Sequence, residues 1–302
     1  MFNKDKRYRP LPSGKSQSRL TIGREGGMAW FTGMSRSLRR WLKVIVLLYC
    51  SIGIALYYLQ EEFLFHPVAI ERNVPWKFNM PFEEMDLPFS KTDTINLVKF
   101  FPADAVRKGV VLYFHGNKEN IGRYAKFAGN FTKYGYEVWM EDYPGFGKSI
   151  GERNEKILYR QAEQLYKLAL SKYPGDSIII YGKSFGTGIA SWLAAGSSAR
   201  QLILETPYFS IPDLFHCYAP IYPNQRMAKY KIPTNEYLPE VKYPITIFHG
   251  TDDGVIPYRC AKKLKHVLKK ADQFITIENG THNNLNEFAL FHQVLDSLLL
   301  LR

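Results

Sequence analysis

Cysteine is scarce in this 302-residue sequence, which contains only Cys50, Cys217 and Cys260 and no C-x-x-C spacing. Three cysteines without that spacing exclude a disulfide framework and a zinc site that is recognisable from the sequence. We expect Cys217 and Cys260 to be buried free thiols, a common environment of unpaired cysteine. A disulfide between them is the alternative if the domain lies outside the cytosol.

The glycine-rich motifs of nucleotide-binding proteins are missing as well. No G-x-G-x-x-G follows the first expected strand, and no G-x-x-x-x-G-K-[ST] occurs in the chain. Both absences argue against a dinucleotide-binding Rossmann domain and a P-loop NTPase among the α/β folds. The sequence has no internal repeat, and nothing in it implies a metal or an organic cofactor.

The body of the chain lacks the excess of positive charge that a nucleic-acid-binding surface requires. The formal net charge is +12, but residues 1–43 hold 11 Lys/Arg and 2 Asp/Glu, whereas the other 259 residues hold 29 and 26. The excess therefore belongs to the N-terminal tail, and we expect no nucleic-acid partner. A hydrophobic content of 46% predicts a packed core.

One long apolar run separates this tail from the body. Residues 1–40 are basic and without a sustained apolar period, which predicts a mostly disordered tail. Residues 44–59 carry no charge, and residues 41–60 are predicted to form a transmembrane signal anchor. A cleaved signal peptide is disfavoured because bulky residues follow the run, and a buried core helix is disfavoured by the basic flank at residues 36–43.

The basic flank predicts the topology of the protein. By the positive-inside rule the N-terminus is cytoplasmic, so the body at residues 61–302 is expected on the extracytoplasmic side. Met34 precedes a compact basic segment, and an alternative start there would leave residues 1–33 out of the protein.

Short apolar runs alternate with helix-compatible segments along the body. Such alternation predicts a mostly parallel sheet flanked by helices. We expect strands at residues 94–101 (half-exposed), 109–114, 137–140, 178–180, 201–204, 245–248 and 274–277, and helices up to about 134 and at 155–170, 187–195, 260–268 and 288–301. Residues 208–243 have no clear period and are expected to form a short lid insertion over an open or shallow pocket.

A candidate nucleophile lies between the strand at 178–180 and the helix that follows. Residues 182–186 fit G-x-S-x-G, in which the serine occupies a sharp strand-to-helix turn with its hydroxyl clear of the sheet. The motif alone is weak, because a glycine-rich turn can contain an incidental serine. The flanking sequence must supply the partners of Ser184.

A carboxylate and a histidine follow two later strands. In a parallel sheet, chemistry belongs at the carboxyl ends of the strands, where Asp253 and His282 are expected. A serine needs a base to take its proton, and the base needs a carboxylate to hold its tautomer. Asp252 is the alternative carboxylate, and Glu205 is a rarer location for it.

The sequence resembles the α/β-hydrolase superfamily over about residues 63–300. It is similar to the group that includes membrane-anchored α/β-hydrolase-domain proteins and serine-aminopeptidase-like or monoacylglycerol-lipase-like enzymes. The resemblance rests on five motifs in family order: F-H-G-N at 114–117, D-Y-P-G-F-G-K-S at 142–149, G-K-S-F-G at 182–186, H-G-T-D-D-G-V-I-P at 249–257 and G-T-H-N at 280–283.

The resemblance implies an α/β-hydrolase fold and assigns roles to individual residues. Ser184 is implied as nucleophile, His282 as general base and then acid, and Asp253 as the orienting carboxylate. The backbone N–H groups of Asn117 and Phe185 would form the oxyanion hole.

Other polar residues near these motifs are expected to be structural. His115 and His249 are predicted to make bonds at strand ends, and Asp142 to shape a turn beside the site. Lys183 is predicted to be solvated, with a modest preference for an anionic substrate.

The leading hypothesis is a membrane-anchored serine hydrolase that cleaves carboxylic ester, thioester or amide bonds of a small or lipid-like acyl substrate. The alternatives are a serine aminopeptidase on the same triad and a non-catalytic membrane-tethered binding protein. The sequence does not assign the acyl chain length or the oligomeric state.

Overall fold

The computed structural model describes residues 35–104 and 107–300 of the chain. Most of the tail predicted at residues 1–40, and the choice of start at Met34, lie outside the described residues. The chain forms two compact units, residues 1–52 and residues 53–302, each of which is described by itself.

Helix α1 (Arg36–Leu64) contains the whole segment predicted at residues 41–60. Within the part of the chain that the structure describes, it is the one helix long and apolar enough to cross a membrane. It begins within its basic flank and continues into the second unit, where its last residues become buried.

The second unit is built on a mostly parallel sheet, as predicted. Its eight strands lie in the order β10-β9-β8-β7-β4-β6-β3-β2. All neighbours from β10 to β6 run parallel, and β3 and β2 extend the sheet antiparallel at one edge. The strands are β2 (Phe82–Pro88), β3 (Thr94–Phe100), β4 (Gly109–Phe114), β6 (Tyr136–Glu141), β7 (Ile178–Lys183), β8 (Gln201–Glu205), β9 (Ile245–Gly250) and β10 (Gln273–Ile277).

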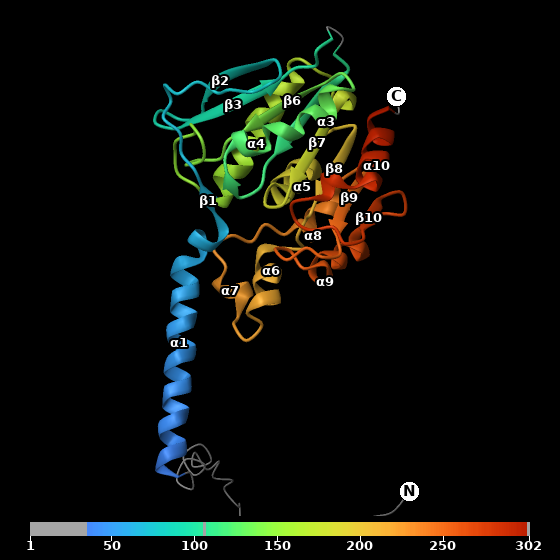
Figure 1. Ribbon diagram of the computed structural model, residues 1–302. Helices are drawn as coiled ribbons and strands as arrows, with labels where there is room; N and C mark the ends of the chain where they lie inside the picture. The colour runs from blue at the N-terminus through green and yellow to red at the C-terminus, as the bar shows by residue number, and fades with distance from the viewer. Residues whose placement is uncertain (1–34, 105–106, 301–302) are drawn as a thin grey trace, which may run out of the picture. The chain divides into compact units, whose positions relative to one another are not determined.

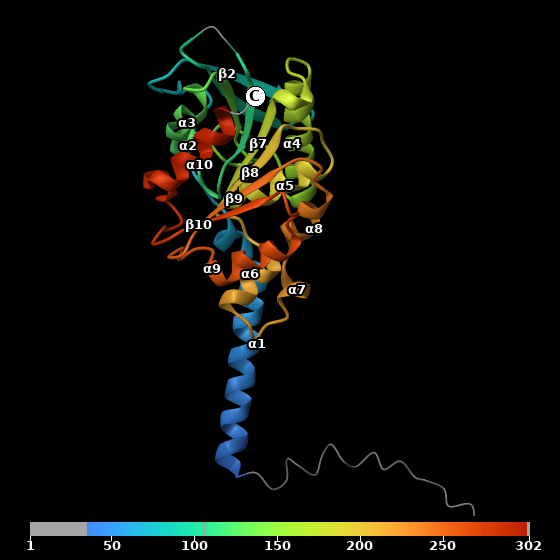
Figure 2. The same ribbon diagram turned by 90° about the vertical axis from the view of Figure 1, so that its right-hand side faces the viewer.

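Helices cover both faces of this sheet. In Figures 1 and 2, α4 (Glu155–Leu170) and α5 (Gly186–Ala195) lie on one face, and α2 (Ile121–Tyr124), α3 (Gly129–Thr132) and α10 (Ala289–Leu300) on the other. The strand sequences dictate both layers, because alternate side chains of a strand point to opposite faces. Ile178 and Ile180 of β7 pack into the core under α4 and α5, whereas Ile179 packs into the core under α10.

Short helices occupy residues 208–243, the segment predicted as a lid, where no period was evident in the sequence. They are α6 (Ile211–Tyr218), α7 (Asn224–Met227) and α8 (Thr234–Tyr237), followed by a 3₁₀ turn at Leu238–Glu240. Helix α9 (Tyr258–Ala261) and a two-stranded pair of β1 (His66–Pro67) with β5 (Lys118–Glu119) complete the unit.

Two expectations from the sequence are wrong. Strand β3 is almost fully buried instead of half-exposed, because β2, which the sequence did not indicate, pairs along its whole length. Cys217 and Cys260 form a disulfide and are not free thiols. This disulfide connects α6 of the lid to α9.

Candidate active site

Ser184 occupies the turn between β7 and α5. Its φ of 52° lies in the left-handed region, which non-glycine residues rarely adopt, so the surrounding structure holds the turn in a strained conformation. A Cβ on Gly186 would lie 2.1 Å from the carbonyl oxygen of Phe114, and one on Gly182 would lie 2.6 Å from Cα of Thr187. Only glycine at these two positions permits α5 to approach the strands so closely. The two glycines of G-x-S-x-G therefore allow the tight turn that holds Ser184.

His282 lies directly beside Ser184. Its Nε2 is 2.8 Å from Oγ of Ser184, and its Nδ1 is 2.8 Å from Oδ2 of Asp253. An ionised Asp253 accepts a hydrogen bond, which places the proton on Nδ1 and leaves Nε2 free to accept from the serine. All three residues are more than nine-tenths buried.

The loop after β9 holds the carboxylate of Asp253 in place. Its other oxygen, Oδ1, accepts hydrogen bonds from the backbone N–H groups of Val255 (2.8 Å) and Ile256 (2.7 Å). Burial by itself raises the pKa of Asp253, but the interactions with His282, with the backbone N–H of Ile256 and with His249 together more than offset it, so the pKa lies below its usual value. The carboxylate of Asp252 is exposed and accepts a hydrogen bond from the hydroxyl of the adjacent Thr251, so the structure brings Asp253 and not Asp252 to His282.

The other strand-end residues make structural contacts, as expected. Nε2 of His249 lies 2.9 Å from the carbonyl oxygen of Ile256, and burial lowers the pKa of this histidine. Asp142 accepts a hydrogen bond from the N–H of Ile121 at the start of α2 and lies 3.3 Å from Nε2 of His115. These contacts fix the loops around Ser184.

Lys183 is not solvated, in contrast to the expectation. Its side chain is buried and forms an ion pair with Glu205 at the end of β8. Glu205 also accepts hydrogen bonds from Tyr181 and Asn286 and is engaged away from His282. A buried carboxylate of this kind needs such partners, and the sequence could not reveal them because they come from β7 and from the 3₁₀ turn at Leu285–Glu287, both distant from Glu205 in the chain.

Two backbone donors are available beside the serine. Within residues 35–104 and 107–300, the N–H groups of Asn117 and Phe185 have no intramolecular acceptor. Asn117 is held by the end of α1, since its Nδ2 donates to the carbonyl of Leu64 (2.6 Å) and its carbonyl accepts from the N–H of His66 (2.9 Å). No local pattern in the sequence indicates this contact, which joins residues more than fifty positions apart.

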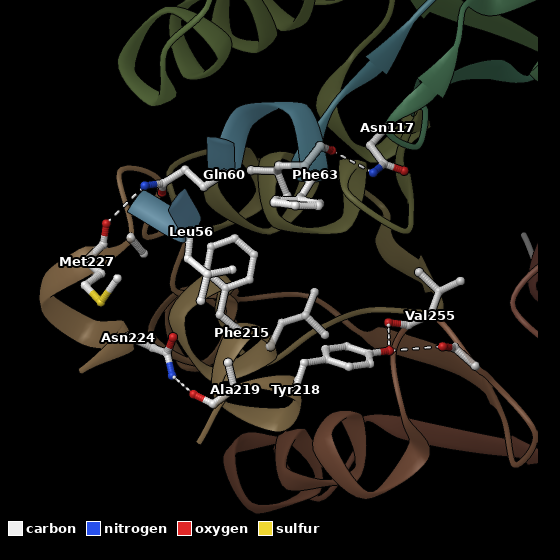
Figure 3. Close-up of a pocket in the computed structure, with 14 residues that line it drawn as sticks. Leu56, Gln60, Phe63, Asn117, Phe215, Tyr218, Ala219, Asn224, Met227 and Val255 are labelled. Carbon is white, nitrogen blue, oxygen red and sulfur yellow. Dashed lines mark hydrogen bonds between the residues drawn. The ribbon is translucent and has the colours of Figure 1, made fainter. Parts of the chain in front are cut away.

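Two cavities open at the site. One, of about 230 Å³, is lined by Ser184 and His282 together with several basic side chains. The other, of about 470 Å³, has a mostly apolar wall formed by the end of α1, by α6, α7 and the residues next to them, and by Asn117, Gly254 and Val255 (Figure 3). Among the described residues, no three His, Cys, Asp or Glu side chains are grouped as metal ligands would be.

Comparison with known sequences identifies similar proteins. The family described as "Serine aminopeptidase, S33" matches residues 105–235. "Alpha/beta hydrolase domain-containing protein 17C" of Xenopus tropicalis is 28% identical over 189 residues, or 60% of this chain and 58% of the relative. The human protein of that name is 23% identical over 233 residues, 74% of this chain and 68% of the relative.

Solved structures share the fold. An esterase from Pyrococcus furiosus superposes with a TM-score of 0.60 at 14% identity, covering 78% of this chain and 97% of that one. The esterase domain of a Rhodothermus marinus protein gives a TM-score of 0.56 at 13% identity, with 72% and 97% coverage. The two likenesses extend over nearly all of either esterase and confirm the predicted fold class.

Proposed function

We propose that this chain, as a member of the α/β-hydrolase superfamily, is a membrane-anchored serine hydrolase of carboxylic ester, thioester or amide bonds. The observation that carries the proposal is the continuous line of hydrogen bonds from Asp253 through His282 to Ser184, ending at a cavity that a substrate can enter. Nucleophile, base and orienting group then have the mutual geometry that acyl transfer requires.

The reaction follows from this arrangement. Nε2 of His282 takes the proton of Ser184 as Oγ attacks the substrate carbonyl, and Asp253 stabilises the imidazolium that forms. The same proton is given to the leaving group, which departs and leaves an acyl-serine. A water molecule, deprotonated by His282, then attacks the acyl-serine. The bond between the acyl carbon and Oγ breaks, His282 returns the proton to Oγ of Ser184, and the carboxylic acid leaves.

Asn117 and Phe185 are proposed as the oxyanion hole. Their unused N–H groups support this role, because a tetrahedral oxyanion needs preorganised donors on the side opposite the base. Loss of one such donor typically costs on the order of 3 kcal/mol in the activation free energy.

Membrane anchoring through α1, with the body on the extracytoplasmic side, is part of the proposal. The length and apolar composition of α1 and its basic start support the anchor. The Cys217–Cys260 disulfide supports the side, because disulfides persist in oxidising compartments. On this proposal residues 41–60 are the anchor, residues 61–302 the hydrolase domain and residues 208–243 its lid.

The two alternatives from the sequence are less well supported. An aminopeptidase needs a carboxylate that holds the free amine of its substrate, and neither cavity has an Asp or Glu in its wall. A non-catalytic binding protein has no need of a base hydrogen-bonded to the serine.

Labelling by a fluorophosphonate probe tests the proposal on the detergent-solubilised full chain. Wild type should be labelled, and Ser184→Ala and His282→Ala should not. Ser191→Ala, which removes another buried hydroxyl in α5, is the matched control and should be labelled like wild type. A folded wild-type protein that takes up no label would contradict the catalytic function.

A further inference from the structure

We propose that the substrate is an anionic acyl amphiphile, whose hydrocarbon chain occupies the 470 Å³ cavity and whose anionic head group occupies the 230 Å³ cavity. Its carbonyl group lies between the two, at Ser184. This inference rests on the proposed function and names the substrate class of the same site.

The two cavities adjoin each other. Phe63, Asn117 and Val255 line both of them, and Asn117 is also the residue whose backbone N–H is proposed for the oxyanion hole. A substrate whose carbonyl oxygen points to Asn117 therefore extends into one cavity on its acyl side and into the other on its leaving-group side. Figure 3 shows Asn117 and Val255 at the end of the larger cavity.

The wall of the larger cavity suits a hydrocarbon chain. Its few polar side chains are already engaged with the protein: Gln60 donates to the carbonyls of Tyr57 and Met227, and the hydroxyl of Tyr218 to the carbonyls of Gly254 and Val255. Most of the surface that faces the cavity is aliphatic and aromatic carbon, with the Phe215 ring pointing into it (Figure 3). Such a wall binds apolar chains by removing their surface from water.

The smaller cavity has the opposite character. Lys118, Arg123, Lys126 and Lys183 line it, and no Asp or Glu does. Arg123 pairs with Glu119 and Lys183 with Glu205, but Lys118 and Lys126 have no carboxylate partner in the part of the chain that the structure describes. Two ammonium groups, those of Lys126 and Lys183, lie 5.1 and 5.2 Å from the centre of the Phe127 ring.

Unpaired cations beside a leaving-group site favour an anionic head group and disfavour a cationic one. Lys118 and Lys126 are exposed, so each contributes a screened interaction. We expect roughly a fivefold effect of each on kcat/KM at low ionic strength.

The test compares three palmitoyl esters in the same mixed micelles: 1-palmitoylglycerol 3-phosphate (anionic), 1-palmitoylglycerol (neutral) and 1-palmitoylglycerophosphocholine (ending in a cation). The full-length wild type should hydrolyse the anionic ester at least tenfold faster than the neutral one and the choline ester no faster than the neutral one. Sodium chloride should reduce this preference.

The variants separate the head-group site from micelle charge. Lys118→Ala with Lys126→Ala should lower hydrolysis of the anionic ester about twentyfold and leave the neutral ester nearly unchanged. Lys270→Ala, which removes an exposed lysine outside both cavities, should leave all three rates unchanged. Equal hydrolysis of the three esters by wild type, or an equal loss on all three in the double variant, would overturn the proposal.

Chain length tests the larger cavity. Longer acyl chains should raise kcat/KM about fourfold per buried CH₂ until the cavity is full. Ala219→Phe, which adds a ring to the wall, should abolish this gain. A length-independent rate would overturn this half of the inference.

A preference for an S-acylated acidic peptide over all three lipids would identify an acylated protein in place of the amphiphile.

The outcomes distinguish this inference from the proposed function. If fluorophosphonate labels Ser184 and butyrate esters are cleaved without any preference for charge or chain length, only the substrate class is wrong. If neither labelling nor butyrate hydrolysis occurs, the proposed function itself is wrong.

Discussion

At the scale of single residues, the site depends on how each carboxylate is surrounded. Asp253 receives two backbone hydrogen bonds and the Nδ1–H of His282, and these contacts keep its pKa low although it is buried. Its neighbour Asp252 has the same chemistry but is exposed. Environment, and not residue type, therefore separates the proposed catalytic carboxylate from an ordinary one.

Replacing Asp253 should impair catalysis by disturbing the histidine. In Asp253→Asn the side-chain NH₂ group can donate a hydrogen bond to Nδ1 of His282. This favours the tautomer with the proton on Nε2, which can no longer accept the proton of Ser184. We expect kcat for p-nitrophenyl butyrate to fall on the order of 10⁴-fold. Asp252→Asn is the matched control and should retain nearly full activity; comparable losses in both variants would argue against the role assigned to Asp253.

Glu141 at the end of β6 is also buried, but its pKa is raised, whereas that of Asp253 is lowered. Both carboxyl oxygens of Glu141 are buried without a hydrogen-bond partner. Burial, with a smaller contribution from Asp142, raises the pKa of Glu141 from 4.5 to about 8. Between these values the unfolded chain is ionised while the folded one is protonated, so the free energy of unfolding falls as the pH rises from about 4.5 to about 8.

Glu141→Gln should remove this dependence on pH. Relative to wild type, the variant should gain stability steadily from pH 5 to pH 8 and by a constant amount above, in total roughly 3 to 5 kcal/mol. Thermal unfolding of the detergent-solubilised chain at several pH values measures the gain. Glu163→Gln, which changes a partly exposed residue of α4, should show no such trend, and a gain that shrinks with rising pH would refute the assignment.

At the scale of elements, the lid is joined to the loop that carries Asp253. The hydroxyl of Tyr218 in α6 donates to the carbonyls of Gly254 and Val255, and the guanidinium of Arg259 in α9 donates to the carbonyl of Cys217. The Cys217–Cys260 disulfide closes the same junction covalently. These contacts therefore fix the position of the wall of the larger cavity relative to Asp253, the proposed catalytic carboxylate.

Loss of this disulfide should affect stability and the larger cavity together. The bond joins residues 43 positions apart, and chain-entropy reasoning gives about 4 kcal/mol for a loop of this length. The double variant Cys217→Ser, Cys260→Ser should unfold at lower denaturant concentration and lose activity on palmitoyl esters more than on butyrate esters.

A reducing agent provides the control for this variant. It should lower the stability of wild type toward that of the double variant and leave the double variant unchanged. If reduction shifts both proteins equally, the effect does not come from this bond.

At the scale of the whole molecule, the helix that is proposed as the anchor also contributes to the site. Its C-terminal part, with Leu56 and Phe63, lines the larger cavity. On the proposed topology the domain lies on the oxidising side, where the disulfide is stable.

Membrane fractionation and proteolysis check this topology. The full chain should remain in the membrane pellet after an alkaline carbonate wash. In intact spheroplasts, added trypsin should digest a C-terminal tag and spare an N-terminal one, and permeabilised cells should lose both. Protection of the C-terminal tag in intact spheroplasts would place the domain on the cytoplasmic side and overturn the proposal.

The sequence alone predicted the fold class, and it predicted Ser184, Asp253 and His282, which the structure brings within hydrogen-bonding distance of one another. It could do so because buried parallel strands are continuous apolar runs, and because the strained turn at Ser184 admits only small neighbours. Both constraints are local and leave their mark on adjacent residues.

Only the tertiary structure revealed the partners that are distant in the chain. Lys183 meets Glu205, Cys217 meets Cys260, and the end of α1 meets both the lid and Asn117. Strand β2 escaped prediction for a related reason, since its acidic sequence has no apolar run and is fixed by pairing with β3. Such contacts depend on where the chain returns in space, which no local pattern of residues encodes.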